Sequence, residues 1–176
     1  MSFFEKLYRV YISNLGSWEQ KRKYLIKKGA NIGEGTRING GLDTFGTEPY
    51  LITVGKDCLF AKFVKLITHD GGVKVLNSLD YYPEKNGDKM GRVVIGDNTY
   101  IGMDAYVMPG VHIGSNCIVG AKSVVTKDVE DNTVVAGIPA RKICTIDEYY
   151  KKAADKIHFT GGLPYEEKKK FYQSEQ

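Results

Sequence analysis

Residues 93–129 read VVIGDNTYIGMDAYVMPGVHIGSNCIVGAKSVVTKDV. An aliphatic residue recurs at every sixth position of this stretch, namely at Ile95, Ile101, Val107, Ile113, Val119 and Val125. An α-helix repeats its buried side chains about every 3.6 residues, and a half-buried strand repeats them every 2 residues. Neither element alone has a period of six, so the spacing predicts a repeated unit of six residues.

The six-residue unit extends beyond this stretch and restrains more than one position. Units begin at residues 32, 54, 60, 95, 101, 107, 113, 119 and 125, and each first residue is a large apolar one. The second residue is Gly in six of these nine units. The fifth residues are all small or β-branched: Thr36, Cys58, Val64, Thr99, Ala105, Val111, Cys117, Ser123 and Val129.

A β-helix is the architecture that this period favours. A short extended segment points its first residue inward, and a tight turn with Gly or Asn-like residues directs the chain to the next face. Three such sides close a coil of eighteen residues, and successive coils stack about 4.8 Å apart. Each fully buried aliphatic side chain contributes roughly 1.5–3 kcal/mol, so the stack is stable although one coil is not. We therefore predict an all-β solenoid.

The repeat is interrupted twice and is flanked by helical patterns. Residues 39–50 loosen the first coil, and residues 70–92 form a long inserted loop, a kind of segment that often carries binding function. We expect an N-terminal helical segment at 1–29, a β-helix at 30–143 and a C-terminal helical cap at 144–176. The first segment ends in a Lys-Lys-Gly helix stop, and Gly16 is a point at which it can divide. Its basic and aromatic residues are interpreted as packing on the main body, with contact to a membrane surface as the alternative.

Composition limits the function classes. The 176 residues are 42% hydrophobic and 26% charged, as in a globular protein, and the net charge of +4 is too small to indicate nucleic-acid binding. The uncharged stretch 105–121 contains Pro, His and Asn and is a poor membrane span, and no secretory signal is visible, so a cytoplasmic location is expected. The three cysteines have no C-x-x-C spacing, which favours reduced thiols over a disulfide framework or a zinc site.

Residues 95–143, IGDNTYIGMDAYVMPGVHIGSNCIVGAKSVVTKDVEDNTVVAGIPARKI, resemble the closing coils of the hexapeptide-repeat acyltransferases. The repeats that carry the resemblance cover about residues 32–142. It implies a left-handed parallel β-helix, and the handedness rests on the resemblance alone. It also implies a homotrimer with active sites between neighbouring prisms and acetyl-CoA as the acyl donor. Within the family the sequence is most similar to sugar O-acetyltransferases, including those of galactosides, maltose and capsular polysaccharides.

His69 is the predicted general base. A sugar hydroxyl that attacks a thioester must lose its proton, and a positioned neutral imidazole typically contributes 10²- to 10⁴-fold to such a step. His69 in LITHDGG directly precedes the inserted loop, where the family keeps its catalytic base. His112, at the sixth place of its unit, and His158, in the expected terminal helix, are expected to face solvent. Asp70 is expected to serve the turn rather than to orient the imidazole.

The resemblance also implies residues for the donor and the acceptor. The donor positions are Ala121, Thr126, Lys127 and Arg141, of which the two cations suit the phosphates of CoA. Met103 stands where relatives often have Ser near the thioester, so oxyanion stabilisation there would have to come from backbone N–H groups. The acceptor candidates are Asn39 in the irregular first coil and Asp80, Tyr81 and Tyr82 in the inserted loop.

Three other functions were weighed against transfer to a sugar hydroxyl. N-acetylation of an amino sugar, free or nucleotide-linked, would use the same base, and the sequence does not separate it from O-acetylation. A zinc carbonic anhydrase needs three converging histidines, two of them five apart, whereas His69, His112 and His158 are 43 and 46 residues apart. We therefore expect no metal. A non-catalytic binding solenoid would need ranks of Thr on one side, which the sequence lacks.

Overall fold

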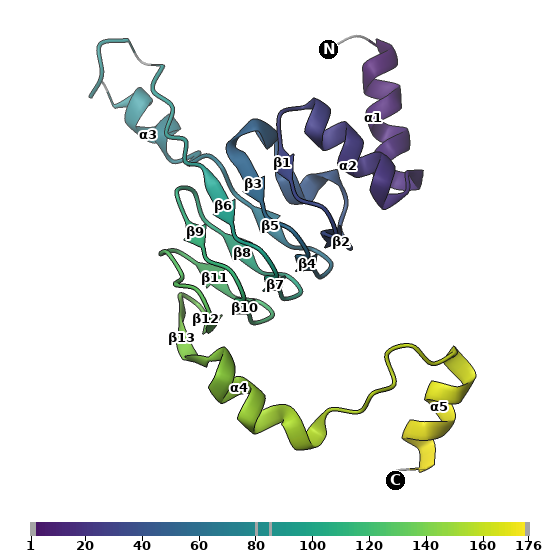
Figure 1. Ribbon diagram of the computed structural model, residues 1–176. Coiled ribbons are helices and arrows are strands. Elements are labelled where there is room, and N and C mark those ends of the chain that lie inside the picture. Colours follow the sequence, from purple (N-terminus) through teal and green to yellow (C-terminus); the bar gives the residue numbers. More distant parts are fainter. Residues whose placement is uncertain (1–2, 80, 85, 175–176) are drawn as a thin grey trace. The chain divides into compact units, whose positions relative to one another are not determined.

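The computed structural model describes residues 3–79, 81–84 and 86–174 (Figure 1). The chain divides into two compact units, one extending to Ile146 and the other beginning at Asp147. Among the described residues, the first unit contains all the strands, two N-terminal helices and one short helix in the inserted loop, and the second contains helices joined by short irregular segments. Each unit is described separately below.

The strands of the first unit form three sheets, which we call faces A, B and C. Face A contains β1 (Asn31–Ile32), β3 (Ile52–Val54), β6 (Val93–Ile95) and β9 (His112–Ile113). Face B contains β2 (Arg37–Ile38), β4 (Leu59–Phe60), β7 (Tyr100–Ile101), β10 (Ile118–Val119), β12 (Thr133–Gly137) and β13 (Ala140–Thr145). Face C contains β5 (Lys65–Leu66), β8 (Tyr106–Val107) and β11 (Val124–Val125).

The chain visits the three faces in turn and so winds into a three-sided coil (Figure 1). All pairings between the coils are parallel. Tyr100 pairs with Ile118 and Tyr106 with Val124, so each regular coil contains eighteen residues. The parallel sheets and the helices at both ends of the chain agree with the expected architecture. We call the corners where the chain passes between faces the AB, BC and CA edges.

The interior is filled by the two positions of each hexad that the sequence singles out. All nine first residues and all nine fifth residues are buried, with 9% or less of each residue exposed. The large first residues and the small or β-branched fifth residues together make one continuous core. The predicted inward positions are therefore confirmed throughout the coil.

Glycine and asparagine have different roles at the edges. A Cβ at Gly96 would lie 2.7 Å from the carbonyl carbon of Gly114, and one at Gly102 would lie 2.5 Å from the amide nitrogen of Ala121. The second-place glycines are therefore required by the close approach of the next coil. The left-handed backbone falls instead on the fourth place of the unit, as at Asn98 and Asn116, whose φ angles are 50° and 56°. Asn tolerates this conformation better than most residues.

Both interruptions of the repeat lie within the coil and can be measured from the strand register. Asn31 pairs with Thr53, 22 residues later, and Lys65 pairs with Tyr106, 41 residues later, instead of the regular eighteen. The first interruption contains two short 3-10 turns, η1 (Leu42–Phe45) and η2 (Pro49–Leu51). The second interruption contains helix α3 (Val73–Ser78). Both excursions return to the CA edge.

The N-terminal segment divides into two helices at Gly16, as the sequence allows. Helix α1 covers Phe3–Leu15 and helix α2 covers Trp18–Lys27. Ser17 caps α2 in a capping box with Gln20, which satisfies backbone N–H groups that a helix start leaves without partners. Ile12 and Leu25 are buried against the coil. Packing on the main body therefore accounts for one face of α1 and for part of α2.

The regular coil ends at an antiparallel hairpin formed by β12 and β13. The second unit contains α4 (Ile146–Ala153), the 3-10 turn η3 (Ala154–Lys156) and α5 (Tyr165–Ser174). His158 follows η3 and is not helical, so the expected single helix through this residue is wrong. Its ring makes edge contacts with Phe171 and Tyr172 of α5. These contacts pack His158 against α5.

Fifth-place side chains at the AB edge join one coil to the next through hydrogen bonds. Thr99 Oγ1 donates to the carbonyl of Gly114 over 3.0 Å and accepts from the amide of Cys117 over 3.2 Å. The Cys58 thiol makes the corresponding bond to the carbonyl of Gly96 at 3.0 Å. Burial raises the pKa of the Cys58 thiol, which keeps the donor protonated. No described cysteine forms a disulfide.

Replacing Thr99 with Val is expected to destabilise the fold although the side chains have nearly the same shape. The change leaves a buried carbonyl and a buried amide without this partner, which costs about 1–3 kcal/mol in the free energy of unfolding. Urea denaturation would measure the loss. Thr53→Val, at a partly exposed position of β3, is the control. An equal loss for both variants would show that the hydrogen bonds of Thr99 do not support the stack.

Candidate active site

Several candidate site residues of the first unit, with ionisable or hydroxyl side chains, lie along the CA edge. Glu48 lies on this edge in the first coil, His69 in the second, and Thr126 and Lys127 in the fourth. Coils joined by parallel ladders are about 4.8 Å apart, so the edge is a line of regularly spaced positions. Strand ladders on two faces hold each of these positions.

His69 is held where the inserted loop leaves and rejoins the coil. The Gly91 amide donates to the Thr68 carbonyl over 2.8 Å, and the Asp70 amide donates to the Lys89 carbonyl over 2.9 Å. His69 itself forms an antiparallel bridge with Met90. The two ends of the loop are thus joined on either side of His69. Its backbone is fixed, and 51% of its side chain remains exposed.

Glu48 is the group that orients the imidazole. Its Oε2 lies 3.0 Å from Nδ1 of His69 and accepts a hydrogen bond of 2.6 Å from the buried Thr68 hydroxyl. Only 14% of the Glu48 side chain is exposed. The Asp70 carboxylate, by contrast, accepts from the Gly72 amide and pairs with Lys89. Asp70 therefore serves the turn, as expected from the sequence, and Glu48 takes the orienting role.

The sequence did not identify Glu48 because it lies in the irregular part of the first coil. The hexad count is lost between residues 39 and 50, so the direction of each side chain there could not be assigned. The only local signal is an acidic residue directly before Pro49. The pairing with His69, 21 residues later, depends on the 22-residue register that only the structure reveals.

The charge of Glu48 fixes the tautomer of His69. Burial alone would raise the pKa of the Glu48 carboxyl, but hydrogen bonds from Thr47, Thr68 and His69 outweigh it, so the pKa lies below its ordinary value. Glu48 is therefore a carboxylate at neutral pH and can only accept from Nδ1. The proton of a neutral His69 then sits on Nδ1, and Nε2 keeps its lone pair. This arrangement can accept a proton from a bound hydroxyl or amine.

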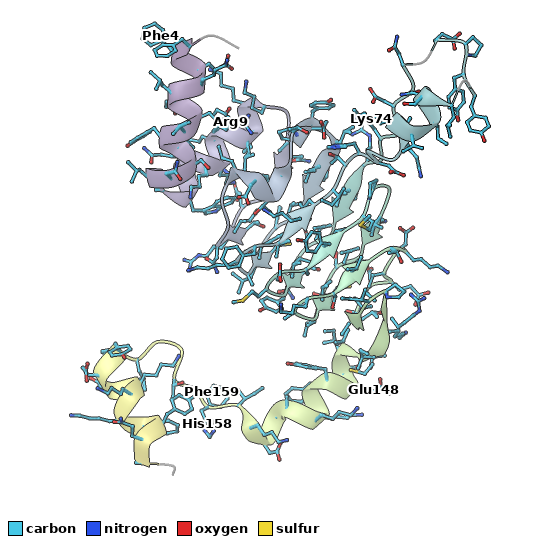
Figure 2. The ribbon with its side chains drawn as sticks, turned by 180° about the vertical axis from the view of Figure 1, so that it is seen from behind. Phe4, Arg9, Lys74, Glu148, His158 and Phe159 are labelled. Atoms are coloured by element: carbon cyan, nitrogen blue, oxygen red, sulfur yellow. The ribbon has the colours of Figure 1, made fainter. Side chains whose placement is uncertain are left out.

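A cleft of about 480 Å³ opens in front of this pair, between the CA edge and the inserted loop. Lys74 and Asn77 of α3 form part of its wall, and Figure 2 shows Lys74 on this helix. The Asn77 side chain bonds both the amide and the carbonyl of Gly87, at 3.0 and 2.9 Å. These two bonds hold the returning half of the loop against α3. The volume lies within the usual range for small-molecule sites.

The predicted donor residues separate into two groups. Lys127 and Arg141 line a second cleft of about 310 Å³ together with Asp128 and Glu130, and Thr126 adjoins Lys127 on the CA edge. Met103 and Ala121 instead lie on the BC edge, eighteen residues apart and therefore one coil apart. Within one chain, the structure thus brings Thr126 and Lys127 onto the edge that holds His69, and it leaves Met103 and Ala121 on another.

The predicted acceptor residues are not gathered at His69. Asn39 is exposed directly after β2, and Tyr81 and Tyr82 are exposed on the inserted loop. None of these three is among the described residues that line the cleft of His69. Asp80 lies outside the described residues. From the inserted loop, α3 supplies Lys74 and Asn77 to the cleft instead.

His112 of the first unit does not line the cleft of His69. His112 is exposed on β9, and its amide donates to Asp128. Among the described residues, no three His, Cys, Asp or Glu side chains converge as metal ligands. In the same part of the chain, the helices are too short or too polar to span a bilayer.

Comparison with known proteins defines the class of this fold and site. The family profile "Bacterial transferase hexapeptide (six repeats)" matches residues 92–127. Protein CapG of Staphylococcus aureus is 44% identical over 144 residues, which cover 81% of each chain. Galactoside O-acetyltransferase of Escherichia coli K12 is 33% identical over 155 residues, covering 84% of this chain and 73% of that one.

A solved structure shares the fold. A hexapeptide-repeat acetyltransferase of Vibrio cholerae, determined in complex with acetyl coenzyme A, matches with a TM-score of 0.53 and 18% identity, covering 78% of this chain and 82% of that one. The sequence relatives therefore identify an acetyltransferase, and the solved structure shows that it shares the three-sided fold. The chain belongs to the hexapeptide-repeat acetyltransferase family.

Replacing Thr68 with Val is expected to raise the pKa of Glu48, because the carboxylate loses one of the hydrogen bonds that stabilise its charged form. A carboxyl whose pKa is lower in the folded state stabilises the protein above its unfolded pKa, and this stability is lost as the pH falls through the folded pKa. In T68V, the pKa of folded Glu48 should lie closer to its unfolded value. The part of the folding stability that Glu48 contributes, and that is lost on acidification, should therefore be smaller. Carboxyl ¹³C NMR titration would measure the pKa directly. An unchanged Glu48 titration would contradict the role of Thr68.

Proposed function

We propose that the protein transfers an acetyl group from acetyl-CoA to a hydroxyl of a sugar or of a surface-polysaccharide precursor, with His69 as the general base. The observation that carries this proposal is the contact of 3.0 Å between His69 Nδ1 and Glu48 Oε2 at the cleft. It leaves Nε2 free to accept a proton. A histidine fixed in one tautomer by a carboxylate is suited to general base catalysis.

The relatives support the donor and the class of acceptor. The matched relative from Escherichia coli is named for O-acetylation of a galactoside, and the Vibrio cholerae structure contains acetyl coenzyme A. The cleft lined by Lys127 and Arg141 offers two cations of the kind that bind the phosphates of CoA. Acetyl-CoA is the acyl donor in this proposal, and no metal takes part.

The reaction requires one proton transfer in each direction. As the acceptor hydroxyl oxygen attacks the thioester carbon, Nε2 of His69 takes the hydroxyl proton. The resulting imidazolium is stabilised by the Glu48 carboxylate at Nδ1. When the tetrahedral intermediate collapses, the carbon–sulfur bond breaks and the departing CoA sulfur receives the proton from Nε2. The products are the acetylated sugar and CoA with a free thiol.

The negative charge of the tetrahedral intermediate also needs donors. Met103 has no hydroxyl to offer, although relatives often have Ser at the matching position. Backbone N–H groups of the coil are the remaining donors of the right kind at this place. Removing the Met103 side chain should therefore affect the fit of the thioester more than the charge stabilisation.

A homotrimer with a left-handed coil is part of the proposal. His69 and Met103 lie on different edges of one chain, so a second copy is needed to place both groups beside one thioester. Two copies that set the CA edge of one against the BC edge of the other would bring them together. In this arrangement, residues 30–143 are the catalytic domain, and residues 144–176 form a separate helical segment.

His69→Ala is expected to lower kcat by about 10²- to 10⁴-fold, because the acceptor loses its base. The KM for acetyl-CoA should change little, since the imidazole does not contact the nucleotide in this mechanism. Thiol release from acetyl-CoA across a panel of sugars and amino sugars would measure both quantities and separate O- from N-acetylation. His112→Ala is the control. Acceptor-dependent release at the wild-type rate in H69A would show that another group is the base.

Glu48→Gln is expected to lower kcat by about tenfold or more, because Gln keeps the size of the side chain but not the charge that stabilises the imidazolium. Since Glu48 acts through His69, the change should have almost no further effect in the H69A background. A double-mutant cycle on kcat tests this directly. Independent, additive losses would instead mean that Glu48 contributes to the reaction without His69.

A further inference from the structure

One side of helix α1 contacts the rest of the first unit, and the opposite side is exposed and largely apolar. On the inner side, Glu5 forms an ion pair of 2.6 Å with Lys28, the C-cap residue of α2. The ring of Tyr8 lies 6.1 Å from that of Tyr24, and Ile12 is fully buried. Arg9 lines a small pocket beside Lys28 and faces α2 in Figure 2. Contacts with the rest of the unit therefore account for only this side of the helix.

The outer side of α1 is an uninterrupted apolar stripe. Phe4, Leu7, Tyr11 and Leu15 follow one another at spacings of three and four residues, and Phe3 and Val10 lie beside them. Phe4 is 80% exposed, Leu15 76% and Leu7 52%. Figure 2 shows Phe4 at the free end of the helix, pointing away from the coil. An apolar patch of this extent on a surface indicates a binding partner.

The same two helices hold the whole positive surplus of the protein. Residues 3–28 contain seven Lys or Arg and two Glu, a surplus of +5, whereas the whole chain has 25 and 21 and a surplus of +4. The rest of the chain therefore carries a net charge of −1. Lys6, Lys23 and Lys27 are exposed on these helices. A basic surface beside aromatic and aliphatic side chains is the composition of helices that lie in the membrane interface.

We propose that α1 and α2 bind an anionic membrane surface, with the stripe of Phe4, Leu7, Tyr11 and Leu15 entering the interface. Thirteen residues are too few to cross a bilayer, which takes about 20, so α1 lies along the surface. Two like-charged copies of this segment would repel each other, whereas anionic headgroups attract it. Membrane attachment would bring the CA edge close to acceptors that are bound to the same surface.

Vesicle flotation of the full-length protein tests this proposal. The protein should bind vesicles of equal parts phosphatidylglycerol and phosphatidylcholine, bind phosphatidylcholine vesicles much more weakly, and lose binding as salt rises to about 0.5 M. Phe4→Ser with Leu7→Ser should weaken partitioning by at least about tenfold. The control Phe159→Ser with Leu163→Ser removes the same two side-chain types from exposed positions of the second unit and should bind as the wild type does.

Two further measurements distinguish binding to an anionic membrane from other contacts that would cover the stripe. Lys6→Gln with Lys27→Gln leaves the stripe intact and should weaken binding to anionic vesicles only. The mass of each variant in solution would show whether the stripe instead covers a second copy. A lower oligomeric mass for the Phe4 and Leu7 variant would overturn the proposal. The proposal is also overturned if the wild-type protein fails to bind anionic vesicles, or if the Phe4 and Leu7 variant binds them as well as the wild type does.

Discussion

The close stacking of consecutive coils is the constraint on which the rest of the structure depends. At Gly96 and Gly102 the neighbouring backbone lies within 2.7 Å of where a Cβ would be, so the chain can turn there only with Gly. Thr99 and Cys117 then supply side-chain hydrogen bonds that join adjacent coils at the edge. Each coil thus satisfies the polar groups of its neighbour, which is why a short stack would be unstable and a long one is rigid.

The candidate site takes its precision from this stacking. Glu48 and His69 belong to segments that are irregular when viewed alone, yet both begin and end on ladders that the regular coils fix. The inserted loop is held at its base on both sides of His69, and Asn77 holds its returning half. The tip of a loop anchored in this way can vary in sequence without moving the imidazole. Variable loops on a rigid scaffold commonly determine which ligand a protein binds.

The period of six was sufficient to predict the core, because burial in a coil depends only on position within the hexad. It predicted the inward residues at all nine units and the eighteen-residue coil. The same reasoning could not reach Glu48, since the count is lost between residues 39 and 50. It also assigned the turn to Gly and Asn together, whereas Gly96 meets a neighbouring backbone and Asn98 adopts the left-handed conformation. Local propensity alone does not separate these two causes.

The distribution of side chains over the edges bears on how the enzyme assembles. His69 and Lys127 share the CA edge, whereas Met103 and Ala121 share the BC edge, so a single prism presents two incomplete halves of the proposed site. In a closed ring of three or more copies, each contact joins two different surfaces of the same chain. In the proposed arrangement, a trimer of prisms that joins CA to BC would complete three identical sites at once, whereas a two-fold dimer would pair like edges and complete none. Three-fold symmetry is thus the simplest closed arrangement that fits the positions of these residues.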